Sequence, residues 1–420
     1  MAIVDSPAPP ETVPGSASRT LGQHVNDYFG RVKGGDLGSL PAVLGLIVLC
    51  IWFTIQRPVF FSAINFANLF TQGANVIVIA MGLVFVLLLG EIDLSAGFAS
   101  GVCAAVLAVL LTNQHVPWYL SVLASVGTGL AIGLTLGTLV AKIRIPSFVV
   151  TLAAFLAFQG VALLMLKNGA NISVTDPVIR AIENKNLPIW LSWTLLAVVV
   201  LGYLVVQLLR IRSRAARGLA TDPLALVATR VGGLALLGGL AVYFLNLERS
   251  LNPLRTSLRG VPVVVPLILV LLLVWTFVLG RTAYGRHMYA VGGNQEAARR
   301  AGINVDTIRI SAFVICSGMA AIGGIVAASR ANSVDSNTGG SNVLLYAVGA
   351  AVIGGTSLFG GKGRVLDAVL GGAVVAVIDN GMGLLGYTAG QKFVITGIVL
   401  LAAASVDALS RRRAAATGVR

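Results

Sequence analysis

Acidic residues stand at two places where the surrounding sequence is apolar. Glu91 and Asp93 lie in the short break Leu89–Ser95 between two apolar runs, and Asp379 lies deep inside a later run. Ionisable groups are costly inside a membrane and often line polar pathways, where broken helices face water. A structural interpretation fits equally, because Asp93 or Ser95 could cap the helix that follows the break. The residues alone leave both interpretations open.

A polar segment, residues 281–309, has the pattern of a short capped helix. Asn294 is a suitable N-cap, Gln295–Ala301 form the predicted helix, and Gly302 ends it. Glu296 lies near the helix N-terminus, where a negative charge is favourable. A helix this short is unstable alone, so its loop or a partner surface must hold it. The pattern therefore predicts a docking element.

Small residues surround this helix. Gly292 and Gly293 are expected to turn the chain tightly into it, and Ala297 and Ala298 to form a smooth surface that enters a groove. In the alternative, a solvated topology loop, only the arginine charges of the segment matter. The docking candidates are Gly292, Gly293, Asn294, Glu296, Ala297, Ala298, Arg299 and Gly302.

The sequence carries no catalytic motif that we can identify. Gly355–Gly363 resembles a phosphate-binding loop, but its first glycine is one place out and Gly363 replaces the required Ser or Thr. Gly381–Gly386 matches a dinucleotide pattern inside an apolar run, without the strand and helix that such a site needs. No spacing indicates a catalytic triad or a metal site. We therefore predict neither an enzyme nor a cofactor.

Composition indicates the elements that position these residues. The chain has 420 residues, of which 56% are hydrophobic and 11% charged, with a mean hydropathy of +0.89. Soluble domains contain about 25% charged residues, so this chain is too apolar for a soluble enzyme or most nucleic-acid-binding domains. The net charge of +14 comes from basic residues between apolar runs, where they fix membrane topology. We expect a lipid bilayer, and no nucleic acid, as the partner of this surface.

Twelve apolar runs predict an all-α, polytopic transmembrane helix bundle of about 10–12 spans, some broken or re-entrant. The runs are 40–56, 74–89, 95–112, 118–141, 146–166, 188–209, 228–246, 261–280, 308–329, 343–355, 365–385 and 391–409. The run at 343–355 is short enough to be half of a broken helix. Gly129, Gly133 and Gly137 share one helix face and predict close helix packing.

Charge predicts the topology. If the N-terminus is cytoplasmic, 21 of the 30 Lys and Arg residues fall in cytoplasmic segments and 9 in segments on the other side of the membrane. This excess of cytoplasmic basic residues favours a topology with both termini in the cytoplasm. Residues 1–36 are polar and proline-rich, and we expect a disordered cytoplasmic tail. Residues 37–410 form the predicted transmembrane domain, and 411–420 a basic cytoplasmic tail.

Three segments resemble one protein family. They are similar, in their order along the chain, to signatures of the ABC-transporter permeases for monosaccharides: the break Gly90–Ser95; Tyr289–Asn294 with Glu296–Ala298 and Gly302–Ile303; and Gly354–Gly361. Those permeases are the membrane subunits of ribose, galactose and xylose import systems. The resemblance covers residues 40–410.

The chain is most similar to the xylose-type permeases within that family. It shares their extra stretch, here residues 210–260, and resembles them at Asp379–Met382 and Asp407. Glu91 departs from the family pattern, which has a glycine there, and the role of this extra carboxylate stays open. The sugar, D-xylose or a similar one, is not fixed by the residues.

The resemblance implies an ATP-driven importer in the bacterial inner (plasma) membrane. Two permease subunits, expected to be identical, form the pore; two cytoplasmic ATPases hydrolyse ATP; and an extracytoplasmic binding protein delivers the sugar. Residues 281–309 then become the ATPase-coupling loop. Because neutral sugars are bound through hydrogen bonds, polar groups in the spans become pathway candidates. These are Asp93, Ser95, Gln72, Asn75, Gln159, Asp379 and Asn380.

Two other functions compete with this one. A proton-coupled secondary sugar transporter would use Glu91, Asp93 and Asp379, with Asn380 a possible partner of Asp379. A membrane scaffold or receptor fits the composition but leaves the docking loop unexplained.

Overall fold

A computed structural model describes residue 30 and residues 38–416, with gaps at 168, 220, 222, 251 and 254–256. The predicted tail 1–36, except residue 30, and the last residues of the predicted tail 411–420 thus fall outside the described residues. Residues 411–416 continue the final helix, which reaches Ala416.

A helix occupies each of the twelve predicted apolar runs, so the all-α bundle is confirmed. They are α2 (Leu40–Gln56), α4 (Ala74–Leu88), α5 (Ala96–Ala108), α6 (Trp118–Ala141), α7 (Ser147–Met165), α9 (Ile189–Ala215), α10 (Leu224–Asn246), α11 (Val264–Arg281), α14 (Val305–Ala331), α15 (Ser341–Gly354), α16 (Val365–Leu384) and α17 (Ala389–Ala416). Within the described ranges, nine helical segments are long and apolar enough to span a membrane, and shorter apolar helices include α2 and α15.

Short elements connect the spans. They are a 3₁₀ turn (Pro58–Phe61), α3 (Ala63–Gln72), a π turn (Val109–Asn113), β1 (Ile172–Ser173), α8 (Pro177–Asn184), α12 (Ala283–Gly293), α13 (Gln295–Arg300) and β2 (Ser333–Val334). The strands β1 and β2 pair antiparallel, with Ile172 opposite Val334. Together α3 and α4 form one span, Ala63–Leu88, interrupted at Gly73.

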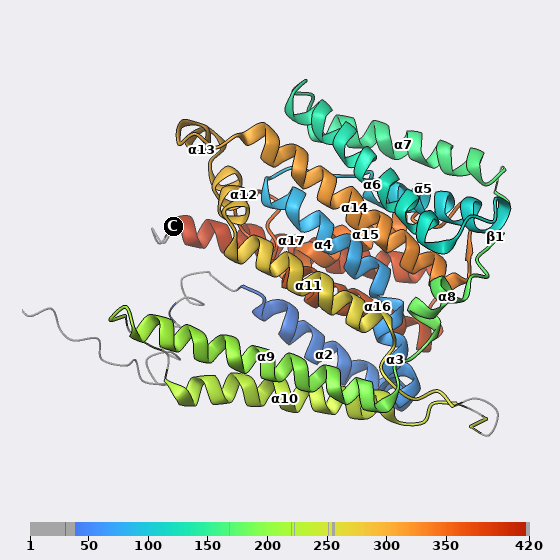
Figure 1. Cartoon of the computed structure of the whole chain (residues 1–420), viewed down its shortest axis with the longest axis horizontal. Coiled ribbons are helices and arrows are strands. Elements are labelled where there is room, and N and C mark those ends of the chain that lie inside the picture. The colour runs from blue at the N-terminus through green and yellow to red at the C-terminus, as the bar shows by residue number, and fades with distance from the viewer. Residues whose placement is uncertain are drawn as a thin grey trace, which may run out of the picture.

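The centre of the bundle is α4. Its residues from Val78 to Leu88 are almost completely buried, and α14, α15 and α16 pack around it (Figure 1). The predicted glycine face of α6 packs on α14: a Cβ atom at Gly129 or Gly133 would overlap the α14 backbone. Close backbone approach, as expected for small residues in membrane helices, therefore holds this pair together.

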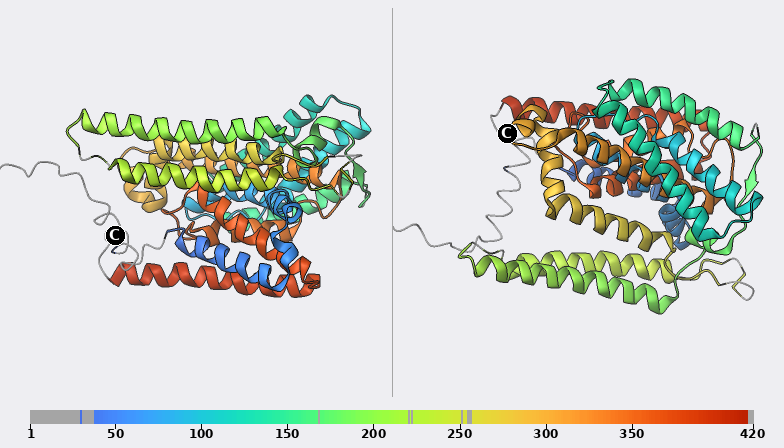
Figure 2. Two further views of the ribbon diagram at one scale, coloured as in Figure 1. Left: turned by 90° about the horizontal axis from the view of Figure 1, so that it is seen from below. Right: turned by 45° about the horizontal axis from the view of Figure 1, so that its top comes forward.

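The hairpin of α9 and α10 lies along one side of the bundle (Figure 2). Only 6% of the apolar window of α9 and 11% of that of α10 are buried inside the protein, against 83% for the span that contains α4. A helix with so little protein contact but high hydropathy presents its surface to lipid or to another chain.

Most long helices run along one direction, so the bundle has two ends (Figure 1). One, which we name the α13 end, carries α12, α13 and the loop 355–364; the other, the α8 end, carries α3, α8 and β1. Ser39 Oγ accepts a hydrogen bond from Arg364 Nη2 (3.1 Å), which places the start of α2 at the α13 end. The C-terminal end of α17 lies there too.

Candidate coupling and pathway sites

The predicted docking helix is present as α13, one residue shorter than expected. Asn294 Oδ1 accepts a hydrogen bond from the Ala297 N–H (2.9 Å), which is the predicted N-cap. After the helix, Gly302 adopts a φ of +82° and donates its N–H to the Arg299 carbonyl (3.0 Å). This left-handed conformation explains the glycine at the end of α13.

The two glycines before α13 do not form the tight turn that we predicted. Gly292 and Gly293 are the last residues of α12 and are helical. Gly292 is needed for a different reason: a Cβ atom there would overlap the carbonyl oxygen of Leu88, at the end of α4. A Cβ atom at Gly293 would meet open space. Close packing, not turn geometry, therefore distinguishes these two positions.

The two alanines of α13 face opposite directions. Ala298 is 4% exposed and packs into the main core, whereas Ala297 is exposed. Glu296 and Arg299 are exposed beside Ala297 and form a loose ion pair (3.7 Å). Ala298 is the one buried residue of α13, and the rest of the helix, including Ala297, is available to a partner.

The three sequence segments that carry the family resemblance meet at the α13 end. The Gly361 N–H donates to the Leu88 carbonyl (2.8 Å), and the Tyr289 hydroxyl donates to the Gly363 carbonyl (2.7 Å). Burial, and secondarily the negative charge of Asp367, raises the pKa of Tyr289. The loop 355–364, α12 and the end of α4 thus form one hydrogen-bonded unit beneath α13.

The acidic break is built into the same end of the bundle. Glu91 forms an ion pair with Arg309 of α14, which gives this unusual carboxylate a partner that its sequence position does not indicate. Asp93 is 1% exposed, and its Oδ1 accepts hydrogen bonds from the Ser95 N–H (2.9 Å) and hydroxyl (2.6 Å). These bonds form a turn just before α5 and not the predicted cap, because Ser95 is the N-cap residue and its side chain makes no capping hydrogen bond. Oδ2 is left without a hydrogen-bond partner among the described residues.

A second polar network joins α3, α16 and α17 nearer the α8 end. Gln72 Nε2 donates to Asp379 Oδ2 (2.5 Å), and Lys392 Nζ pairs with Asp379 Oδ1 (3.2 Å). Asn380 and Asn65 exchange two amide hydrogen bonds (2.9 Å each), and Asn380 Nδ2 also donates to Gln72 Oε1 (3.1 Å). The structure therefore brings three predicted pathway residues together, although the expected Asp379–Asn380 partnership is not among these bonds.

Two members of this network were missed by sequence reasoning. Asn65 lies seven residues before Gln72 on the same helix, a spacing that places both on one face and could have indicated it. Lys392 stands at the start of an apolar run, where it resembles an ordinary topology residue. Nothing local to Lys392 indicates an ion pair with a residue of the preceding span.

Two pathway candidates lie away from this network. Asn75 is half-buried on α4, and its backbone carbonyl lies beside Gly323 of α14. Gln159 is exposed on α7, facing away from the bundle. The seven predicted pathway residues thus divide among the α13 end, the α3–α16–α17 network and these separate positions.

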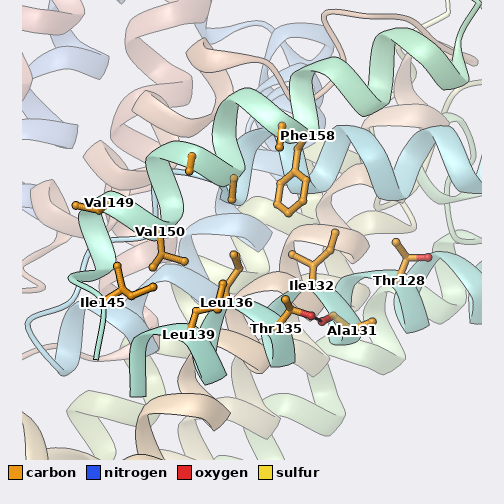
Figure 3. Close-up of a pocket in the computed structure, with 13 residues that line it drawn as sticks. Thr128, Ala131, Ile132, Thr135, Leu136, Leu139, Ile145, Val149, Val150 and Phe158 are labelled. Carbon is orange, nitrogen blue, oxygen red and sulfur yellow. Dashed lines mark hydrogen bonds between the residues drawn. The ribbon is translucent and has the colours of Figure 1, made fainter. Parts of the chain in front are cut away.

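A cavity of about 610 Å³ lies between α6 and α7, and Figure 3 shows its apolar lining. Among its lining residues only Thr128 and Thr135 carry hydroxyls, which donate to carbonyls of their own helix (2.8 and 2.9 Å). The walls leave almost no polar group for a ligand. This cavity suits an apolar occupant and is not a sugar site.

An all-α bundle with span-length apolar helices defines a multi-pass membrane protein. Residues 65–404 match the family described as the branched-chain amino acid transport system permease component, and the chain belongs to this family. It is the permease component of a transport system.

Curated relatives cover almost the whole chain. It is 34% identical over 386 residues to the xylose transport system permease protein of Escherichia coli K12, covering 92% of this chain and 95% of the relative. The Haemophilus influenzae xylose permease is 31% identical over 384 residues (91% and 99%), and the E. coli ribose import permease protein 28% over 380 residues (90% and 96%). The predicted resemblance is confirmed. No solved structure matches the chain.

Proposed function

We propose that this chain is the membrane subunit of an ATP-driven ABC importer for a monosaccharide, D-xylose or a similar sugar. The observation that carries this proposal is near-full-length similarity to xylose permeases, with the three shared segments assembled into one unit beneath α13. Although the family description refers to branched-chain amino acids, the curated relatives named above transport sugars by name.

In this proposal, residues 281–309 couple the permease to a separate cytoplasmic ATPase. The exposed face of α13 around Ala297 meets the ATPase, while buried Ala298 and the Gly292–Leu88 contact transmit its movement to the bundle. The chain has no recognisable phosphate-binding loop of its own, which fits an ATPase supplied by another chain.

The α13 end is then cytoplasmic and the α8 end extracytoplasmic, in a bacterial inner membrane. The excess of basic residues in the segments that flank the spans at the α13 end supports this orientation, with both termini inside. An extracytoplasmic binding protein docks on the α8 end, and a second copy of the chain completes the pore. Residues 37–410 form the permease domain, of which 210–260 is the stretch additional to shorter family members.

The α3–α16–α17 network supports a pathway for a neutral substrate. Its groups are mostly amides, and its carboxylate is neutralised by Lys392, so the site offers hydrogen bonds without an uncompensated charge. A proton-coupled transporter instead requires a carboxylate that gains and loses a proton. Glu91 and Asp379 each have a cationic partner, so of the three carboxylates named for that alternative only Asp93 has no ion pair among the described residues.

The decisive experiment uses vesicles that contain the chain with its cognate ATPase and binding protein. Import of D-xylose should stop when ATP is depleted and continue when only the proton gradient is dissipated. Import that continues without ATP but requires the gradient would replace this proposal with the proton-coupled transporter.

A pair of variants tests the coupling role of α13. Ala297→Trp places a bulky group on the exposed face, so we expect normal membrane insertion, weakened ATPase association and uncoupled import. Ala216→Trp, the same substitution at an exposed position after α9 and outside the coupling segment, is the matched control and should behave as wild type. Normal ATPase association and import in Ala297→Trp would refute docking through this face.

A further inference from the structure

The apolar cavity between α6 and α7 opens on the outer surface of the bundle. Because α6 packs on α14 and α7 packs mainly on α5, the two helices leave about 610 Å³ between them (Figure 3). Small lining residues on both helices are exposed, among them Ala131 and Thr135 of α6 and Ala153 and Ala157 of α7. In a protein that spans a membrane, such an opening faces lipid or another chain.

The inner wall of this cavity is apolar and firmly packed. Leu136, Val150 and Ala154 line it and belong to the main core of the bundle. If the cavity were empty, its walls would lose van der Waals contacts, and water would find almost no polar partner there. A flexible, apolar lipid acyl chain can fill the space without leaving a polar group unsatisfied.

Two cations lie at one end of this cavity. Leu139 and Ile145, which line it, flank the turn between α6 and α7 (Figure 3), and this turn carries Lys142 and Arg144. Both cationic side chains are exposed, and neither forms an ion pair or a hydrogen bond within the described ranges. An anion could therefore bind to them without displacing an existing partner.

The turn itself does not explain these charges. Arg144 adopts a φ of +66°, a left-handed conformation that favours glycine after a helix. The Glu91 carboxylate belongs to the break that contacts the start of α7, where the Ile92 N–H donates to Ser147 Oγ (3.4 Å). Glu91 is already paired with Arg309, so it does not neutralise the two cations.

We propose that this cavity is a binding site for an anionic phospholipid, with one acyl chain between α6 and α7 and the phosphate against Lys142 and Arg144. The walls suit an apolar chain, and the two cations at the end of the cavity suit a negative head group. The molecule of a bilayer that carries both is an anionic phospholipid. Basic pockets between membrane helices bind lipid head groups through the same electrostatic attraction.

The head group lies at the α13 end in this arrangement. Gly137, near the end of α6, packs so closely on α14 that a Cβ atom there would come within 2.8 Å of Ile310. Ile310 lies near the start of α14, shortly after α13. The site depends on the membrane location of the chain and not on which substrate it carries, so it stands apart from the proposed function.

The first test compares two lipids that differ only in charge. Native mass spectrometry of the full chain measures the affinity for phosphatidylglycerol and for phosphatidylcholine with the same acyl chains. Wild type should bind the first phosphatidylglycerol about tenfold or more tightly. Lys142→Gln/Arg144→Gln should lose this preference, whereas Arg210→Gln/Arg212→Gln, which removes two exposed charges at the end of α9, should keep it. An equal preference in the two double variants overturns the inference.

The second test fills the cavity. Ala153→Phe places a ring in it from the α7 wall and should weaken binding of both lipids. Ala197→Phe, at an exposed position of α9, is the matched control and should bind as wild type does. Unchanged binding in Ala153→Phe overturns the inference.

Should Ala153→Phe fail to fold, photolabelling of the wild-type chain replaces it. Phosphatidylglycerol with a diazirine in its acyl chain should label the cavity walls within residues 128–158, and labelling confined to other helices overturns the inference.

A second copy of the chain on this face is the rival occupant. Thr135 is exposed at the cavity, so Thr135→Cys reports such a contact as a disulfide-linked dimer that wild type does not form. Dimers through Thr135→Cys without photolabelling of residues 128–158 would assign the face to a subunit contact and overturn the lipid site.

Discussion

The α13 end and the α8 end are assembled from different kinds of contact. At the α13 end, glycines such as Gly292 allow backbone segments to pack directly against each other, and Glu91 forms an ion pair with Arg309. At the α8 end, an unsatisfied carboxylate, Glu183, lines a polar cavity, and the amide pair Asn65–Asn380 lies nearby in the bundle. Close-packed contacts fix geometry, whereas amides and free carboxyls can exchange partners. The comparison indicates a rigid end and an adaptable end.

Adding a methyl group or more at Gly292 should produce the largest effect. In Gly292→Val the side chain overlaps the Leu88 carbonyl, so we expect destabilisation of more than about 3 kcal/mol and loss of import. Thermal unfolding and transport in vesicles measure both effects. Gly293→Ala controls for helix propensity, and similar defects at the two positions would show that the α13 end is not rigidly packed.

Raising the pH should destabilise the α8 end. Between pH 4.5 and about 8 the unfolded chain releases the Glu183 proton while the folded chain keeps it, so stability is lost as pH rises through this window. The expected loss is on the order of 2–4 kcal/mol. Melting temperatures measured across this pH range in lipid nanodiscs should fall for wild type and much less for Glu183→Gln. Parallel curves for both proteins would remove Glu183 as the cause.

The amide pair Asn65–Asn380 should show a moderate coupling energy. Its two hydrogen bonds of 2.9 Å predict an interaction of about 1–2 kcal/mol in a double-mutant cycle with alanine at each position. Denaturation of the two single variants and the double variant gives this value. Additive effects would mean that the two amides contribute independently.

The surface ion pairs of α13 should matter least to stability. Glu296 lies 3.7 Å from Arg299 and 3.4 Å from Arg300, and all three side chains are more than half exposed. Exposed pairs contribute about 0–1 kcal/mol, so Glu296→Gln should shift the free energy of unfolding by less than about 1 kcal/mol. A larger shift in a thermal melt would place α13 within the folded core.

Features encoded locally could be predicted from the sequence, and features made by distant contacts could not. The spans follow from apolar runs, and the Asn294 cap follows from a residue type and its position. The role of Gly292 depends on Leu88, about two hundred residues earlier, so a turn was the natural but wrong expectation. The Asn65–Asn380 pair spans 315 residues, and no single segment contains its pattern.

Glu183 illustrates the same limit. It lies in an amphipathic helix where an exposed carboxylate is the ordinary expectation, and only the packing of α14 against α8 buries it. Its missing hydrogen bonds, like the volume of the cavity, exist only in three dimensions.

The interruption at Gly73 gives α4 the properties of a lever. A 15-residue helix is about 22 Å long, and burial along nearly all of α4 leaves it little room to bend. The C-terminal end of α4 contacts Gly292 through the Leu88 carbonyl. At its N-terminal end, Gly73 lies so close to α16 that a Cβ atom there would come within 2.9 Å of Ala376. Gln72 of the polar network immediately precedes Gly73. A small tilt of α4 imposed at its Gly292 end would therefore displace its Gly73 end sideways against α16. The interruption at Gly73 would let α4 move in this way relative to α3.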